Sequence, residues 1–242
     1  QDVLIVRDLR TLPIGEYLND NIMNIYLALL QQRSNRYAAN NEEILRCHFF
    51  RTQFFRNLYP LEADLADKRS RAPMTSGGKV KSQYNFTKVA RETANIEGLF
   101  KMQMLFIPVH FLSPEHWALI VVNFIDRRIE WFDPLNYRGG GVVELTMVYQ
   151  WLKHAHKQKT GEEWKQGGWR FVSWPNRQKG VPQQNDGYNC GVFALTTAEY
   201  YSRGAVLDYD TYKHWDRRLR RRILHAVVTR TLRGTEALVQ PA

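Results

Sequence analysis

Cysteine is scarce in this sequence, since only Cys47 and Cys190 occur among its 242 residues. Two cysteines can form neither a disulfide framework nor a cysteine-rich zinc site, which excludes disulfide-stapled secreted modules and zinc fingers. A chain of this length buries enough apolar surface to fold without such cross-links. We therefore expect a protein of a reducing compartment, with no bound metal.

Long apolar runs are also missing. The longest ones, such as Trp117–Val122, are far shorter than the roughly 20 residues that cross a bilayer, so no membrane span is expected. No signal peptide, internal repeat or linker rich in proline and glycine is visible. The chain opens with Gln1 rather than Met, so we expect residues 1–242 to be a single domain from a longer protein.

Acidic residues are outnumbered, with 24 Asp and Glu against 34 Lys and Arg and a formal net charge of +10. Such an excess favours an acidic partner, which leaves nucleic acid, acidic lipid and acidic protein open. Part of the excess lies near the C-terminus, and we interpret it as the solvated face of a helix. The arginines concerned are Arg217, Arg218, Arg220, Arg221 and Arg222.

The residue pattern predicts helices towards both ends of the chain and strands in the middle. Apolar residues at helical spacing follow Asn19-Asp20, where Asp20 can cap a helix. Further helices are predicted at 86–94, 145–156, 190–202 and 209–232. Strands rich in Val and Ile are predicted at 104–111, 117–124, 129–132 and 169–174. Polar or glycine-bearing loops are predicted at 34–43 and 66–83. This grouping indicates the α+β class rather than a regular βαβ alternation.

Cys190 is the strongest candidate for a chemically active residue. It follows a polar loop that contains Gly187, and it begins a predicted helix. A helix N-terminus carries partial positive charge and unpaired N–H groups, which favour the nucleophilic thiolate. On this pattern alone, a buried structural cysteine remains an equal alternative. Cys47 lacks any such context, so we interpret it as structural.

A cysteine nucleophile needs a base and a group that orients the base. His116 stands immediately before one predicted strand, and Asp133 directly follows the last residue of the next one. A hairpin with its turn near Arg127 would bring the two roughly opposite one another, whereas Asp126 lies in the turn at the far end. The remaining histidines are expected on the surface or as satisfied core residues. They are His48, His110, His154, His156, His214 and His225.

A developing oxyanion needs hydrogen-bond donors. Gln184 lies on the loop that leads to Cys190, and the backbone N–H of Cys190 is the natural second donor. Gln183 is the alternative side-chain amide. Simple loop solvation would equally explain either glutamine.

The order His, Asp, Gln, Cys resembles that of the ubiquitin-like-protein-specific proteases, the SUMO protease family. Four local patterns carry the resemblance, which runs from about residue 12 to residue 225. They are Tyr17-Leu18-Asn19-Asp20, Pro108-Val109-His110 with His116-Trp117, Phe132-Asp133, and Val181-Pro182-Gln183-Gln184 with Cys190-Gly191-Val192-Phe193. Each pattern is weak alone, but four in this order are highly specific.

The resemblance implies a papain-like α+β fold with a central, mainly antiparallel sheet flanked by helices, and no cofactor. It implies a cysteine protease domain that cleaves after the Gly-Gly tail of a ubiquitin-like modifier, most directly SUMO, in precursors and in lysine conjugates. The implied catalytic roles are nucleophile for Cys190, base for His116, orienting group for Asp133 and oxyanion donor for Gln184.

The resemblance also implies a substrate channel that only glycine can thread, because other residues carry a side chain. Trp117 would cover this channel, and Tyr17, Asn19 and Asp20 would contribute to substrate binding. Two residues depart from the family pattern: Tyr17 stands where a second tryptophan is usual, and Asn189 where aspartate is frequent. An intracellular site in the nucleus or at the nuclear envelope is implied, with the cytoplasm as the alternative.

Three other functions remain open on the sequence. A sibling enzyme could act on another ubiquitin-like modifier or on ubiquitin. Bacterial effector acetyltransferases share a similar fold and a Cys-His pair. The match of Trp117 and the glycine channel to the SUMO protease family argues against them. An inactive binding module, or a nucleic-acid binder led by the basic C-terminus, would not need all four catalytic candidates.

Overall fold

The computed structural model describes most of the chain. The described residues are 2–40, 45–59, 84–94, 96, 98–136, 140–164, 167–173, 181–210 and 214–232. The loop predicted at 66–83 lies outside them, as do residues 41–43 of the loop predicted at 34–43.

A five-stranded sheet in the order β1-β2-β3-β4-β5 forms the centre of the fold. Its strands are β1 (Cys47–Phe49), β2 (Met104–Leu112), β3 (Glu115–Asn123), β4 (Arg128–Phe132) and β5 (Arg170–Ser173). The three middle strands are antiparallel, as predicted, but β1 runs parallel to β2 and β4 parallel to β5. Both outer pairs are joined by chain segments that contain helices, and such crossovers are what parallel pairing requires. The sheet is therefore mixed.

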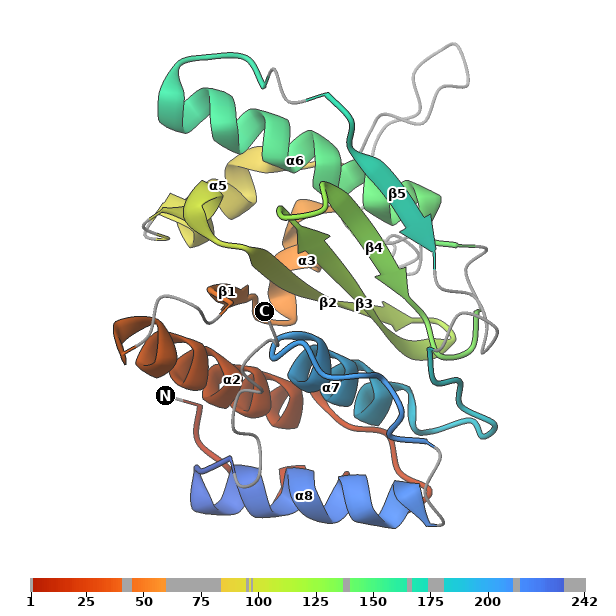
Figure 1. The fold of residues 1–242 in the computed structure, drawn as a ribbon. Helices are drawn as coiled ribbons and strands as arrows, with labels where there is room; N and C mark the ends of the chain where they lie inside the picture. The colour runs from red at the N-terminus through yellow and green to blue at the C-terminus, as the bar shows by residue number, and fades with distance from the viewer. Residues whose placement is uncertain are drawn as a thin grey trace.

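Helices cover both faces of this sheet (Figure 1). The described helices are α1 (Val6–Leu9), α2 (Asp20–Asn40), α3 (Gln53–Leu58), α5 (Phe86–Ala94), the short 3-10 helix Leu99–Lys101, α6 (Val142–Thr160), α7 (Cys190–Tyr201) and α8 (Trp215–Thr229). Helices α2 and α7 lie on one side and separate the sheet from α8, while α3, α5 and α6 lie on the other side. None of the described helices has the length and apolar character that crossing a bilayer requires.

Neighbouring residues of one strand serve two separate cores. Phe106 joins the core formed with α2 and α7, whereas Leu105 and Ile107 join the core formed with α3 and α6. A strand that is buried on both faces reads as a continuous apolar run rather than an alternating one. For this reason the apolar runs in the middle of the sequence indicate strands, but they do not indicate which side chains face which side of the sheet.

Two expectations about α2 are wrong in detail. Asn19, not Asp20, caps the helix, because the Asn19 side-chain oxygen accepts a hydrogen bond from the N–H of Ile22 at 3.0 Å. The helix also continues to Asn40, so residues 34–40 are helical rather than a loop. Asn35 and Arg36 are exposed, whereas Ser34 is buried and its hydroxyl accepts from the N–H of Cys47. The polar residues that suggested a loop thus lie partly on an exposed helix face and partly in the interior.

Candidate active site

Cys190 is the first residue of α7 and is buried. The predicted helix start is therefore confirmed. The following residue, Gly191, lies against Leu18 and Trp117, and an added Cβ atom would come within 3.1 Å of Leu18 and 3.2 Å of Trp117. These contacts are tighter than a side chain normally accepts. Glycine after the cysteine thus lets α7 approach the strand that carries His116.

His116 and Asp133 are in direct contact. The Nε2 atom of His116 lies 2.7 Å from Oδ1 of Asp133, and both side chains are buried. The N–H of Leu135 donates to the same carboxylate oxygen at 3.0 Å. Cys190 lies close enough to His116 to raise the pKa of its imidazole as well. The structure therefore joins the cysteine, the histidine and the aspartate in one chain of contacts.

The strand register explains this contact. Leu119 pairs with Phe132 in the β3–β4 ladder, so Asp133 continues the line opposite Ala118 and lies diagonally from His116. Residues two apart on a strand share a face, and diagonal partners are within reach of long side chains. The predicted hairpin is thus confirmed with a shift of its register. Asp126 lies in the turn at the other end of the hairpin, bonded to Asn123 and Arg128.

The surroundings of His116 stabilise its charged form. Burial alone would lower the pKa of His116, but the hydrogen bond to Asp133 and the neighbouring Cys190 outweigh it and raise the pKa to about 9. A buried imidazole beside a carboxylate behaves in this way because the nearby negative charge favours imidazolium. At neutral pH this histidine is therefore protonated and can give up a proton.

Gln184 lies on the loop before Cys190, as expected. Its backbone N–H donates to the carbonyl of Pro134 at 3.1 Å, which ties this loop to the segment after Asp133. Its side-chain Nε2 donates to the carbonyl of Asp186 at 2.8 Å. One amide hydrogen is thus used inside the loop, and the second remains for another acceptor. Gln183 is half-buried and donates to the adjacent Pro182 carbonyl.

Asp186 holds the last turn before the nucleophile. Its Oδ1 accepts from the backbone N–H groups of Tyr188 and Asn189 at 3.0 and 2.9 Å, and its Oδ2 accepts from the Asn189 side chain at 2.8 Å. The aspartate side chain thus forms a turn with the backbone of the residues that follow it. Asp186 is not among the site residues predicted from the sequence, although the Asp-Gly pair in the loop is a recognised turn signal.

Trp117, which the resemblance implies as the cover of the substrate channel, is fully buried. Its indole is 0% exposed, stacks on His110 with a centroid separation of 3.9 Å, and donates from Nε1 to the carbonyl of Leu18 at 2.9 Å. The side chain is nevertheless next to Gly191 and hence beside Cys190. Trp117 is placed as a wall of the site rather than as a surface lid.

His110 is buried, but the expectation of a satisfied core histidine is wrong. Neither of its ring nitrogens has a hydrogen-bond partner among the described residues. Burial lowers its pKa, against the opposing effect of Asp20 and Glu115. The nearest carboxylates are 4.0 Å away on Asp20 and 3.7 Å away on Glu115. The ring stacked beneath Trp117 is therefore held neutral.

The expected substrate-binding residues before and within α2 have different surroundings. The Tyr17 phenol is partly exposed and lies near Gly187 on the nucleophile loop. The Asn19 side chain is used inside the protein, since it caps α2 and donates to Asp8 at 2.9 Å. Asp20 is partly exposed at the start of α2. Tyr17 and Asp20 can thus reach a ligand without breaking internal bonds, whereas Asn19 cannot.

Arg220 supports the site, although the sequence predicts it on the solvated face of a helix. It is 3% exposed, so this part of the basic cluster is not a solvated face. Its Nε donates to the side-chain oxygen of Asn189 at 2.9 Å, and its terminal nitrogens donate to the carbonyls of Leu12, Pro13 and Glu16 at 3.1, 2.7 and 2.8 Å. The guanidinium thus fastens the residue before the nucleophile to the segment before α2.

The other cysteine occupies an unreactive position. Cys47 is buried, and burial raises the pKa of its thiol to about 12. Its sulfur lies within weak hydrogen-bonding distance of the carbonyls of Leu45 and Ser202. Across the described part of the chain, no three His, Cys, Asp or Glu side chains gather closely enough to hold a metal ion.

Comparison with protein families gives a match over nearly the whole chain. Residues 16–227 match the sequence model of the Ulp1 protease family, C-terminal catalytic domain. The chain is 29% identical over 204 residues to the ubiquitin-like-specific protease ESD4 of Arabidopsis thaliana, covering 82% of this chain and 35% of that protein. It is 26% identical over 208 residues to sentrin-specific protease 2 of Mus musculus, covering 85% and 29% respectively. The chain thus spans about a third of the length of these relatives.

Solved structures show a similar fold. The SUMO protease Ulp1 with its catalytic cysteine oxidised to a sulfinic acid superposes with a TM-score of 0.67 at 21% identity, covering 95% of this chain and 85% of that chain. The C-terminal Ulp1 protease domain in complex with Smt3, the yeast orthologue of SUMO, gives a TM-score of 0.64 at 22% identity, with 93% and 83% covered. The predicted papain-like α+β fold is confirmed.

Proposed function

Because this chain belongs to the Ulp1 protease family and carries its C-terminal catalytic domain, we propose that it is a cysteine protease acting on a ubiquitin-like modifier. The reaction is hydrolysis after the C-terminal Gly-Gly of the modifier, in precursors and in conjugates to lysine side chains. SUMO is the proposed modifier, since similar proteins are named as SUMO or sentrin proteases. The contact of His116 with both Asp133 and Cys190 carries the proposal.

In the first half of the reaction, the Cys190 thiolate attacks the carbonyl carbon of the terminal glycine. The carbonyl electron pair moves to oxygen, where the backbone N–H of Cys190 and the second amide hydrogen of Gln184 donate to it. Protonated His116 then gives its proton to the departing lysine amine, and the bond to that amine breaks. A thioester between the modifier and Cys190 remains.

In the second half, water releases the modifier. Neutral His116 takes a proton from water as the water oxygen attacks the thioester carbonyl, and Cys190 leaves as thiolate beside the imidazolium that has formed. Asp133 fixes the ring orientation and favours imidazolium at both stages. One water is consumed for each bond cut, and no cofactor takes part.

The modifier tail is proposed to lie between Trp117 and the nucleophile loop. The indole of Trp117 would form the wall of the tail site on the sheet side, and the Tyr17 phenol would form the wall near Gly187. Asp20, at the start of α2, would meet the modifier body. Side chains larger than hydrogen would collide with such walls, which suits a Gly-Gly tail. Asn19 would contribute indirectly, by capping α2.

A panel of modifiers with a vinyl sulfone at the C-terminus tests this function, because the probe forms a covalent adduct only with a reactive thiol. We expect an adduct with the SUMO probe for the natural chain and for the Cys47→Ser variant. The Cys190→Ser variant should give none and should retain its unfolding midpoint. Adduct formation by Cys190→Ser would refute the nucleophile, and capture by ubiquitin or another modifier alone would refute the choice of SUMO.

The cell compartment is a separate part of the proposal. We place the protein in the nucleus or at the nuclear envelope, on the resemblance to SUMO proteases. Fluorescent tagging of the full-length protein tests this, and an exclusively cytoplasmic signal would contradict it.

A further inference from the structure

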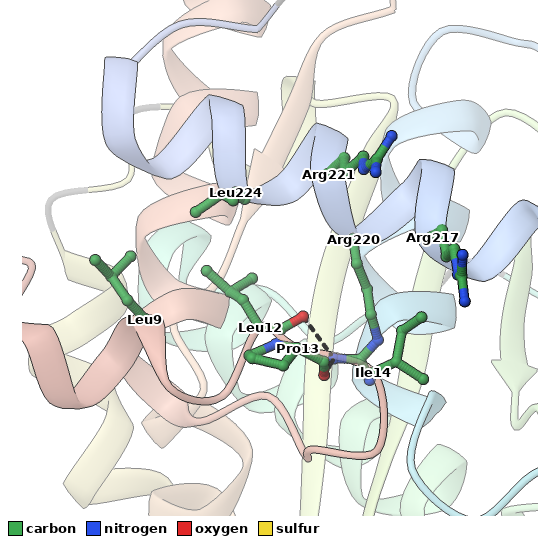
Figure 2. A pocket seen from close by; sticks show the side chains of 8 residues that line it. All are labelled: Leu9, Leu12, Pro13, Ile14, Arg217, Arg220, Arg221 and Leu224. Atoms are coloured by element: carbon green, nitrogen blue, oxygen red, sulfur yellow. Dashed lines mark hydrogen bonds between the residues drawn. The ribbon is translucent and has the colours of Figure 1, made fainter.

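A cavity of about 360 Å³ opens between α8 and the segment before α2. We propose that it docks a partner peptide that presents apolar and acidic side chains together, at a place distinct from the proposed tail site. Figure 2 shows Leu224 of α8 directed towards Leu12 and Leu9, with Arg217 and Arg221 extending from the same helix. The proposal stands on this cavity and does not depend on the catalytic reaction.

Most of the cavity lining is apolar. Its apolar members are Leu9, Leu12, Pro13, Ile14 and Leu224. Ile14 is 43% exposed and Leu224 is 39% exposed, so side chains of a ligand can reach both. Exposed apolar side chains that line a cavity mark a place where another molecule binds.

Two arginines give the cavity a positive edge. Arg217 and Arg221 are four residues apart on α8, so they lie one above the other on one face of the helix. Both are exposed, and neither has a carboxylate partner among the described residues. A guanidinium group matches the two oxygens of a carboxylate, with paired hydrogen bonds. The edge therefore selects Asp or Glu side chains beside the apolar ones.

The inner wall of the cavity is already rigid. Arg220 also lines it, but its guanidinium donates to Asn189 and to the carbonyls of Leu12 and Pro13. This arginine is therefore held in place by the protein and fixes the position of the segment opposite α8. A preformed wall lowers the ordering cost of binding, and the volume is within the range of ordinary ligand pockets.

A peptide fits this cavity better than nucleic acid does. Nucleic acid contacts rest on phosphates and require cationic side chains across an open surface, with aromatic rings where single-stranded bases stack. Here five of the eight lining residues are apolar and none is aromatic. A leucine-containing acidic peptide would satisfy both the apolar lining and the arginine edge.

Fluorescence anisotropy with a labelled peptide tests the proposal. The probe is a peptide of about twelve residues with a leucine at every third or fourth position and aspartates between them, and lysines replace the aspartates in its control. We expect the aspartate peptide to bind and the lysine peptide not to bind. Leu224→Asp and Arg221→Glu should each weaken binding by about tenfold or more, through lost apolar contact and lost carboxylate pairing.

Two matched variants serve as controls. Val143→Asp places an aspartate at an exposed apolar position of α6, on the opposite side of the sheet from α8, and Arg170→Glu reverses a charge on β5, away from the cavity. Both should bind the peptide within twofold of the natural chain. All four variants change exposed positions, and their unfolding midpoints should show that the fold is kept.

Three results would overturn the proposal. The first is no binding of the aspartate peptide at 100 µM protein. The second is equal weakening by the cavity variants and by their controls. The third is tighter binding of a labelled oligothymidine of similar length that depends on Arg221 but not on Leu224, which would assign the surface to nucleic acid instead.

Discussion

His116 links the proposed chemistry to the stability of the fold. Its pKa is raised to about 9 in the folded protein, above about 6.5 for an unperturbed histidine. The folded state therefore binds the proton more tightly than the unfolded state. The resulting stabilisation is complete below about pH 6.5 and is lost as the pH rises through about 9. Because Asp133 causes much of this shift, replacing it should alter both the reaction and the pH dependence of stability.

Asp133→Asn should lower kcat/KM by about two to four orders of magnitude, as loss of the orienting carboxylate does in catalytic triads. The basic limb of the pH–rate profile should also move to lower pH, because imidazolium loses its charged partner. Steady-state kinetics between pH 5 and 10 would measure both effects. Asp126→Asn, in the turn of the same hairpin, should change neither. An unchanged basic limb in Asp133→Asn would show that another group holds His116.

Trp117 is buried enough for its loss to affect folding. Trp117→Ala would remove the ring stacked on His110 and the hydrogen bond to the Leu18 carbonyl. We expect it to lower the free energy of unfolding by about 3–5 kcal/mol, as in other large-to-small core substitutions. Trp117→Phe should cost clearly less, because an aromatic ring remains. Urea denaturation measures both, and a loss below about 1 kcal/mol for alanine would contradict the buried position.

Helix α8 supports the nucleophile from the far side of α7. Figure 1 shows α7 between α8 and the sheet, and Arg220 reaches from α8 to Asn189 at the start of α7. Asn189 in turn donates to Asp186. Because the three side chains form one hydrogen-bonded series, a change in α8 can displace the loop that carries Gln184.

Arg220→Met should therefore act on stability and on catalysis together. It leaves the carbonyls of Leu12 and Pro13 without their donor, and we expect a loss of about 3 kcal/mol or more in the free energy of unfolding. At a temperature where the variant remains folded, kcat should also fall, because the Asn189 contact is lost. Arg217→Met, an exposed position on the same helix, should change stability by less than about 0.5 kcal/mol. Normal kcat in folded Arg220→Met would refute the positioning role.

The sequence predicts local structure here better than it predicts long-range contacts. The apolar periodicity after Asn19 and the Val-rich and Ile-rich runs in the middle identified α2, β2 and β3, because helix and strand patterns depend on nearby residues. The predicted hairpin also placed His116 and Asp133 close together on adjacent strands. Arg220 could not be assigned, because its partners near residue 12 come from the other end of the chain. A run of arginines looks the same whether one of them is buried or all are solvated.

The parallel edges of the sheet and the burial of Trp117 were missed for the same reason. Pairing of β1 with β2 depends on how the intervening helices pack, and no residue of β1 encodes its direction. Trp117 is covered by Leu18 and His110, which lie on other segments of the chain. Cys190, His116 and Asp133 could be found because each lies next to the end of a predicted helix or strand, and Gln184 because it belongs to a short motif on the loop before Cys190.

The net charge of +10 acts at longer range than any of these contacts. A field of this sign speeds the approach of an acidic partner and is screened by salt. The screening length falls from about 10 Å at 0.1 M salt to about 3 Å at 1 M. Once the modifier is bound, the rate depends on the position of the scissile carbonyl relative to Cys190, and that position is set by short-range contacts.

Raising the salt concentration from 0.1 to 1 M should therefore raise KM for a modifier–lysine conjugate while changing kcat little. We expect kcat/KM to fall by about tenfold, because encounter weakens as the charges are screened. A short fluorogenic peptide that ends in Gly-Gly and lacks the modifier body is the control, and its kcat/KM should change by less than twofold. If kcat falls for the conjugate, or if both substrates respond equally, salt acts on the catalytic residues and charge steering does not explain the effect.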